Sequence, residues 1–231
     1  MECLKITAFS DIHFQSRSNS SGGKEILSCL RNMVTEINRD IKPDIVCVLG
    51  DLVSDDPPAL NEVASVLNLI ERPVMVIPGN HDGNRDDFFT IFPPLPDFID
   101  LAGCRLIPFA DEDAADFNSY RTADQIERLV GLVSGFDGPV ISLQHVPLLF
   151  DQAALAYSDF YCINYKEIAE AVQGKVTHTL SGHFHKGGIF CPENGVCQLI
   201  CPAFYKEPFN FLDITVGFDY TDIKIKSLFD G

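Results

Sequence analysis

The chain has 231 residues, with 33 acidic side chains against 17 lysines and arginines, which gives a formal net charge of −16. Binding along a nucleic-acid backbone requires clustered basic residues, so this charge balance argues against a nucleic-acid partner. Apolar residues make up 46% of the chain, which is enough for the core of a single domain over residues 1–231. The sequence contains no run of about 18 apolar residues, so no membrane span is predicted.

Strand and helix patterns alternate along the first three quarters of the chain, as in an α/β fold. Short apolar runs predict strands at residues 4–9, 45–49, 74–77, 105–109, 140–143 and 176–180. Helical spacing of apolar residues predicts helices at residues 26–37, 58–70, 122–133 and 164–174, the third opening on a capping box of Thr122 and Gln125. Residues 84–116 show only one short strand, and their acidic run at 111–113 is expected in a solvated loop. From residue 188 onward, the pattern predicts antiparallel hairpins.

The N-terminus and the cysteines bear on the cellular compartment. The first residues, MECLKITAFSD, lack the basic region, apolar stretch and cleavage site of a secretory signal. None of the eight cysteines forms a CxxC pair, so a zinc ribbon is not expected. Cys191, Cys197 and Cys201 lie near one predicted hairpin and could pair if oxidised, but we expect reduced thiols and a cytoplasmic protein. The oligomeric state is left open.

Polar side chains follow five of the predicted strands, where ligands bind in open α/β sheets. They are Asp11 and His13, then Asp51, then Asn80, His81 and Asp82, then His145, and finally His183 and His185. Five of the six histidines in the chain belong to this set. The sixth, His178, alternates with apolar residues on a strand, and we interpret it as structural. Histidines scattered through a core would not gather in this way, so the sequence predicts a shared site.

Imidazole, carboxylate and amide groups on converging loops are ligands for metals such as Zn, Mn or Fe. Asp11 and His13 are two positions apart, as are His183 and His185, so on extended backbone both members of a pair would point the same way. Each pair could therefore serve one metal or two adjacent ones. Seven candidate ligands are too many for one tetrahedral zinc and suit two metals that share a bridging carboxylate.

The motifs DIH, GD, GNHD, a lone histidine and GHFH, in this order from Asp11 to His185, resemble those of the calcineurin-like metallophosphoesterases. The resemblance implies a four-layer αββα sandwich, in which two mixed β-sheets are flanked by helices, and a centre of two Mn, Fe or Zn ions. It assigns Asp11, His13 and His185 to one metal, Asn80, His145 and His183 to the other, and Asp51 to the bridge. It also makes His81 a non-ligand near the leaving group, and Asp82 the acid that orients His81.

The activity implied by the resemblance is hydrolysis of a small phosphate ester by metal-bound hydroxide. The compact arrangement of motifs is most similar to the cyclic-nucleotide and glycerophosphodiester phosphodiesterases of the family, so a phosphodiester is the expected substrate. A phosphomonoesterase and a non-catalytic scaffold with the same fold stay as alternatives. The chain departs from common family usage after the GD motif, where Ser54 precedes Asp55, and inside GHFH, where Phe184 is large.

Substrate contacts are expected from loops around the metals. The candidates are Arg17 in a polar loop and two groups of aromatic residues, Phe88, Phe89 and Phe92, and Tyr157, Phe160 and Tyr161. An aromatic wall would suit a nucleobase or another flat group. The simpler interpretation places these aromatic residues in the core, and the sequence leaves both open.

Overall fold

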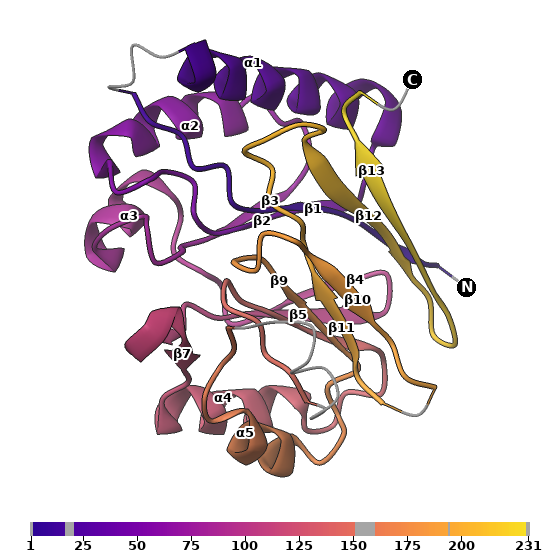
Figure 1. The fold of residues 1–231 in the computed structure, drawn as a ribbon. Coiled ribbons are helices and arrows are strands. Elements are labelled where there is room, and N and C mark those ends of the chain that lie inside the picture. Colours follow the sequence, from indigo (N-terminus) through magenta and orange to yellow (C-terminus); the bar gives the residue numbers. More distant parts are fainter. Residues whose placement is uncertain (1, 17–20, 151–159, 194, 230–231) are drawn as a thin grey trace.

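A computed structural model describes residues 2–16, 21–150, 160–193 and 195–229. Two large β-sheets pack face to face, and helices cover the outer face of each (Figure 1). The fold is therefore the four-layer αββα sandwich that the family resemblance implied. Within the described residues, no helix is long and apolar enough to cross a membrane.

The first sheet has the strand order β13-β12-β1-β2-β3. Its parallel strands are β1 (Leu4–Phe9), β2 (Ile45–Leu49) and β3 (Val74–Ile77), and its antiparallel strands are β12 (Asn210–Val216) and β13 (Thr221–Ser227). Three helices cover it: α1 (Ser21–Glu36), extended by a π-helical turn (Ile37–Ile41), α2 (Leu60–Leu67), which follows a 3-10 turn (Pro57–Ala59), and α3 (Arg85–Ile91). The hairpin predicted at the C-terminus thus completes the sheet begun by the N-terminal strand.

The second sheet has the order β10-β11-β9-β8-β5-β4. Its strands are β4 (Ile99–Leu101), β5 (Cys104–Pro108), β8 (Val140–Leu143), β9 (His178–Ser181), β10 (Gly188–Phe190) and β11 (Cys197–Ile200). Helices α4 (Ala123–Val133) and α5 (Tyr165–Val172) cover its outer face (Figure 1). A small hairpin of β6 (Glu112–Asp113) and β7 (Ser119–Tyr120), with a 3-10 turn (Ala115–Phe117) between its strands, precedes α4.

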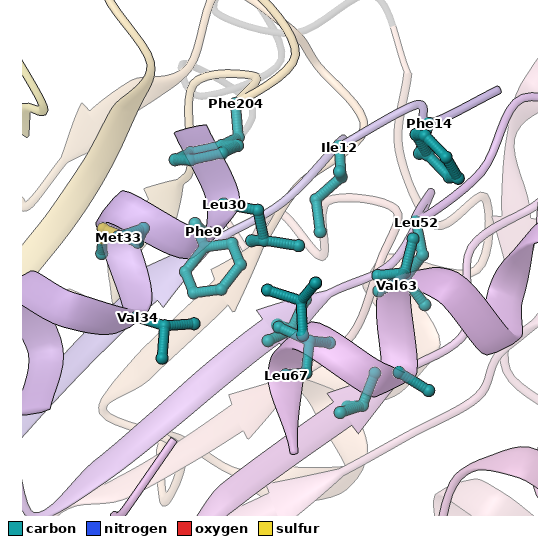
Figure 2. Packing of buried hydrophobic residues seen from close by; sticks show 14 of the residues in the cluster. Phe9, Ile12, Phe14, Leu30, Met33, Val34, Leu52, Val63, Leu67 and Phe204 are labelled. Carbon is teal, nitrogen blue, oxygen red and sulfur yellow. The ribbon is translucent and has the colours of Figure 1, made fainter. Parts of the chain in front are cut away.

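Alternate residues of the central strands face opposite layers. In β2, Ile45, Cys47 and Leu49 pack between the two sheets, whereas Val46 and Val48 pack against α1 and α2. Figure 2 shows the helix-side cluster. Both faces of β2 are buried, which explains why its sequence is a continuous apolar run rather than an alternating one.

Residues 84–116 contain more structure than the sequence predicted, since α3 and β4 lie there. Helix α3 begins after Asn84, whose side-chain oxygen accepts hydrogen bonds from the amides of Asp86 and Asp87. Asn at the N-cap and acids in the first turn are ordinary start signals. The helix has only seven residues, too few for an apolar period to be recognised. The predicted capping box of Thr122 and Gln125 is present at the start of α4.

The cysteines and the remaining histidine can now be placed. Cys191 and Cys197 form a disulfide across the β10–β11 hairpin, so the prediction of reduced thiols is wrong for this pair. Cys201 is a buried free thiol. His178 is buried between the hydroxyls of Thr177 and Thr221, each 2.8 Å from a ring nitrogen, which fits its interpretation as structural.

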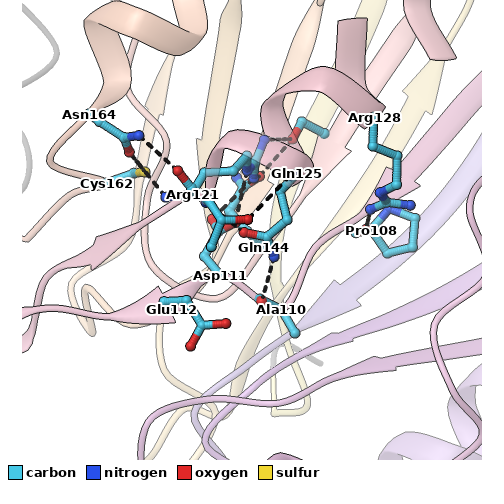
Figure 3. Close-up of polar contacts among 12 residues, drawn as sticks. Pro108, Ala110, Asp111, Glu112, Arg121, Gln125, Arg128, Gln144, Cys162 and Asn164 are labelled. Carbon is cyan, nitrogen blue, oxygen red and sulfur yellow. Dashed lines mark hydrogen bonds and ion pairs between the residues drawn. The ribbon is translucent and has the colours of Figure 1, made fainter. Parts of the chain in front are cut away.

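The acidic run at 111–113 is only partly solvated, because Asp111 pairs with the fully buried Arg121 (Figure 3). The guanidinium of Arg121 donates two hydrogen bonds to the Asp111 carboxylate, at 2.8 and 3.1 Å. It also lies 3.6 Å from the centre of the Phe109 ring. The prediction of a solvated loop is therefore wrong for Asp111, whose charge compensates a cation in the interior.

Replacement of Asp111 by alanine is expected to lower the free energy of unfolding by about 3–5 kcal/mol, since it leaves a buried cation unpaired. Asp100→Ala is the matched control, because Asp100 accepts the same two-pronged contact from Arg105 but its side chain is 44% exposed. An exposed pair of this kind contributes at most about 1 kcal/mol. Urea denaturation of both variants measures the difference, and equal losses would contradict the role assigned to burial.

Candidate metal centre

The loops that follow β1, β2, β3, β8 and β9 meet at one edge of the sandwich. Backbone hydrogen bonds join these loops directly. The amide of Asp11 donates to the carbonyl of Gly50 at 3.0 Å, and the amide of Gly182 donates to the carbonyl of His145 at 2.9 Å. The carboxylates of Asp11 and Asp51 are buried at their centre. The strand-end position inferred from the sequence thus brings the predicted residues together.

Four of the predicted ligands have left-handed backbone, with φ of 55° at Asp11, 48° at His13, 51° at Asp51 and 64° at His183. The extended geometry predicted for the two-apart pairs is therefore wrong, and the side chains converge through tight turns instead. Such conformations are costly for residues other than glycine and concentrate at functional sites. Four such residues in these loops indicate that the backbone accepts strain in order to place these side chains.

Two glycines allow the loops to approach each other. Gly50 has φ of 82°, and a Cβ atom there would lie 2.4 Å from the Nδ1 atom of His145. A Cβ atom at Gly182 would lie 2.5 Å from the Cβ atom of Ser10 and 2.9 Å from the Asp11 carboxylate. Gly182 therefore serves close packing between the loops after β1 and β9.

The first cluster consists of Asp11, His13 and His185, whose potential ligand atoms all lie within 4.8 Å of one another. The Nε2 atoms of His13 and His185 are 3.0 Å apart, and Asp11 Oδ1 is 3.4 Å from His185 Nε2. Burial, partly offset by the carboxylates of Asp51 and Asp11, lowers the pKa of His13. A neutral imidazole is the form that binds a metal.

The second cluster consists of Asp51, His145 and His183, again within 4.8 Å of one another. The Nε2 atom of His145 is 3.2 Å from Asp51 Oδ2, 3.1 Å from Asn80 Oδ1 and 3.1 Å from His183 Nδ1. The backbone carbonyl of Leu49, 2.7 Å from His145 Nδ1, fixes the ring, so Nε2 faces the cluster. The other three predicted ligands of the second metal thus all lie close to the Nε2 atom of His145.

Asp51 belongs to the second cluster and also faces the first. Its Oδ2 atom is 3.2 Å from His145 Nε2 and 3.8 Å from His13 Nε2, and its Oδ1 atom accepts a hydrogen bond from the amide of His81. Burial disfavours the charged carboxylate, but the positive charge of His145 and the His81 amide outweigh burial and lower the pKa of Asp51. Asp51 is therefore an ionised group within reach of both clusters.

The donor set fits a pair of divalent cations. Two buried atoms of the clusters, Asp11 Oδ1 and His183 Nε2, have no hydrogen-bond partner among the described residues. Buried polar atoms are normally satisfied, and those that are not call for a specific explanation such as a bound ion. Four imidazoles, two carboxylates and one amide oxygen form the nitrogen and oxygen environment that Mn, Fe or Zn accepts.

His81 lies beside the clusters, and its partner differs from the one predicted. Its Nδ1 atom is 3.0 Å from Asp55 Oδ1, while its ring is 5.3 Å from that of His13. Asp82 instead accepts hydrogen bonds from the amides of Gly79 and Val53. The carboxylate in contact with the His81 ring is therefore that of Asp55, whereas the predicted partner Asp82 is bound to backbone amides. Asp82 is a buried anchor of its loop, and burial together with the charge of Asp51 raises its pKa to about 7.

Asp55 and Tyr205 are two residues at the site to which the sequence analysis assigned no role. Asp55 has φ of 51°, and this turn after β2 carries it toward the loop after β3. A sequence signal for Asp55 existed, because many family members have an acid shortly after the GD motif. In this chain Ser54 comes first, so the acid stands one position later. Tyr205 places its ring 5.5 Å from that of His13 and 5.2 Å from that of His185, and nothing in the local sequence marks it.

The predicted substrate-contact residues fall into three groups. Phe88 and Phe92 belong to the buried core between α3 and the first sheet, so the simpler interpretation holds for them. Phe160 lines a cavity at the metal clusters together with Phe184, whereas Phe89 and Tyr161 are half-buried and pack against core clusters. Arg17 and Tyr157 lie outside the described residues.

Residues 4–187 match the family model of the calcineurin-like phosphoesterases. The chain belongs to this family. The match begins at the first residue of β1 and ends in the loop after β9, so it contains all the residues of the two clusters. The family resemblance inferred from the five motifs is confirmed.

Relatives of this phosphoesterase were found in sequence and in structure. A probable cyclic nucleotide phosphodiesterase of Rhodopseudomonas palustris, RPA0124, is 36% identical over 96 residues, which cover 40% of this chain and only 34% of that protein. A dimetal phosphatase from Danio rerio superposes with a TM-score of 0.78 at 13% identity, over 99% of this chain and 97% of that one. The purple acid phosphatase PPD1 from yellow lupin gives 0.69 at 14% identity, over 99% and 52%. At these identities the structures establish the fold alone.

Proposed function

We propose that this calcineurin-like phosphoesterase is a phosphodiesterase that hydrolyses a small phosphate diester at a centre of two metal ions. One ion would be held by Asp11, His13 and His185. The other would be held by Asn80, His145 and His183, and Asp51 would bind both ions. The position of Asp51 carries the proposal, because one ionised carboxylate within 4 Å of ring nitrogens from both clusters is what a bridging ligand requires.

The chemistry divides between the ions and the protein. Bound cations would supply Lewis acidity at the phosphoryl oxygens and lower the pKa of water to roughly 7. His81 stands next to the clusters, and in its protonated form it can donate a proton to the departing alkoxide. Because Asp55 contacts Nδ1, that proton would come from Nε2.

The preference for a diester rests on the sequence relative from Rhodopseudomonas palustris, which is described as a probable cyclic nucleotide phosphodiesterase. A phosphomonoesterase remains the second candidate, supported by the dimetal phosphatase with the same fold. The two differ in the charge of the substrate, since a monoester dianion carries one more negative charge than a diester.

The proposal is tested by hydrolysis of bis-p-nitrophenyl phosphate and p-nitrophenyl phosphate with added Mn²⁺. We expect faster turnover of the diester, loss of activity on chelation, and recovery when Mn²⁺ is restored. Faster turnover of the monoester would favour the phosphomonoesterase. No turnover of either ester by protein shown to contain two equivalents of metal would favour the non-catalytic scaffold.

A further inference from the structure

A cavity of about 320 Å³ opens directly onto the metal clusters. Its metal side is lined by Asp51, His81, His183 and His185. The rest of the lining is Lys186 and three phenylalanines, Phe117, Phe160 and Phe184. We propose that this aromatic wall, defined by the three phenylalanines, binds a planar aromatic group carried by the phosphate ester. The inference rests on the proposed function, because the phosphate itself would occupy the metal side.

Phe117 is held in an unusual position for an apolar side chain. It is 62% exposed, and it lies in two consecutive left-handed residues, with φ of 57° at Asp116 and 60° at Phe117. Each such residue costs about 1 kcal/mol or more. A turn that accepts this cost and leaves a large ring in water gains nothing for the core, which points to a role in binding.

The strained turn is fastened to the segment that carries Phe160. Within the turn, the amide of Ala114 donates to the carbonyl of Asn118 at 2.8 Å. The side-chain oxygen of Asn118 then accepts a hydrogen bond from the amide of Tyr161 at 2.9 Å, and the amide of Ile163 donates to the carbonyl of Ser119 at 2.8 Å. Phe117 and Phe160, which are far apart in the sequence, are thereby placed with ring centres 6.3 Å apart at 90°.

The aromatic wall contacts the metal side through the loop after β9, which carries His183 and Phe184. The ring of Phe160 meets that of His183 edge to face, with centres 4.9 Å apart. Phe184 follows His183 in the chain, and the ammonium group of Lys186 lies 5.8 Å from the centre of its ring. A phosphoryl group at the clusters would therefore place its substituent against these rings, with the Lys186 cation beside an anionic ester.

The chemistry of the wall selects for a flat ring. Aromatic faces and edges bind one another at centre distances of about 4.5–7 Å, and such stacking does not depend on particular hydrogen bonds. An aliphatic group of equal size would gain contact area but not the ring–ring interaction. The expected ligand class is thus a phosphate ester with a nucleobase or aryl group, and the wall would distinguish it from a glycerol-type ester.

Three phosphonates separate these contributions, because their P–C bonds are not hydrolysed and binding is measured without turnover. Methylphosphonate reports on the metal side, benzylphosphonate adds a planar ring, and cyclohexylmethylphosphonate adds a bulky ring that is not flat. Isothermal titration calorimetry of the Mn²⁺-loaded protein gives the dissociation constants. We expect benzylphosphonate to bind about 10-fold more tightly than methylphosphonate, and about 2- to 10-fold more tightly than the cyclohexyl compound.

Variants assign the preference to the wall. Phe117→Ala and Phe117→Leu should weaken the preference for the benzyl over the cyclohexyl compound, and both should leave methylphosphonate binding unchanged. Phe218→Ala is the control, because Phe218 is equally exposed at 63% but lies in the turn between β12 and β13. The control should bind all three phosphonates as the unaltered protein does.

The outcomes distinguish this inference from the proposed function. Equal binding of all three phosphonates, an undiminished preference in both Phe117 variants, or an equal loss in Phe218→Ala would each overturn the aromatic wall while leaving the metal centre intact. Failure of methylphosphonate to bind protein that contains two equivalents of Mn²⁺ would overturn the metal-anchored phosphate site, and the wall with it.

Discussion

Asp51→Asn is expected to abolish activity and metal retention together. The asparagine is isosteric, and its side-chain oxygen can still accept the hydrogen bond that the His81 amide donates to Asp51 at 3.0 Å. What changes is the charge at Oδ2, the atom that lies 3.2 Å from His145 Nε2 and 3.8 Å from His13 Nε2. A neutral amide there removes an anionic ligand from both proposed ions at once. Loss of even an outer-shell partner costs 10- to 100-fold in metal affinity. We therefore expect the affinity for metal to fall by at least about 100-fold.

Elemental analysis after dialysis, combined with turnover of bis-p-nitrophenyl phosphate, measures both parts of this prediction. The control is Asp222→Asn, since Asp222 is an exposed acid on the edge strand β13 that pairs with Lys224 and should affect neither quantity. Circular dichroism establishes that the Asp51 variant is folded. Full activity with two ions bound would disprove the bridging role. Loss of a single ion would show that Asp51 belongs to one cluster only.

The strand-end position of the site was predictable from sequence because it follows from topology. Parallel strands place their carboxyl ends at one edge of a sheet, so polar residues after β1, β2 and β3 had to meet. The same holds for His145 and His183 after β8 and β9, which are parallel neighbours in the second sheet. The motifs identified which residues these are. The packing of the two sheets then brings the residues of the first sheet together with those of the second.

The backbone geometry of the site was not predictable, because two-residue spacing does not determine φ. Extended backbone and a pair of left-handed turns can both bring Asp11 and His13 to one point, and the chain uses the turns. The partner of His81 depends in the same way on how two loops cross. Asp82 is its neighbour in sequence, yet the carboxylate within reach is Asp55, 26 residues earlier.

The aromatic wall depends on non-local contacts as well. Phe117 was not singled out in the sequence, and its position requires the hairpin of β6 and β7 to pair with residues 161–163. Of the aromatic residues that were singled out, Phe88 and Phe92 fill the core. Composition shows that aromatic residues are plentiful, but only tertiary structure separates those that pack from those that face the metal clusters.

His81→Ala is expected to slow turnover by about 10²–10⁴-fold, the range typical of a lost general acid, while both metals stay bound. The loss should be greatest for esters with alkyl leaving groups, because p-nitrophenolate departs readily without a proton. Kinetics with a series of leaving groups and elemental analysis of the same samples measure the two effects. If one ion is missing from the variant, His81 is a ligand and not an acid.

The acid that positions His81 is identified by comparing Asp55→Asn with Asp82→Asn. Asp55 is 77% exposed on its side chain, and exposed pairs contribute about 0.2–1 kcal/mol, so Asp55→Asn should slow turnover by only about two- to fivefold, again most for alkyl leaving groups. Asp82 is buried, and both its oxygens accept backbone hydrogen bonds. Asparagine can replace only one of these acceptors, so Asp82→Asn should lower the free energy of unfolding by about 1–3 kcal/mol.

The leaving-group series separates these two roles even where both variants lose activity. A positioning role predicts a loss that grows as the leaving group becomes more basic, because only then does proton donation by His81 limit the rate. A role in anchoring the loop predicts a uniform loss across the series, together with weaker metal binding, because Asn80 lies two residues away. If Asp82→Asn gives the graded pattern and Asp55→Asn does not, then the motif order, and not the 3.0 Å contact, identifies the partner of His81.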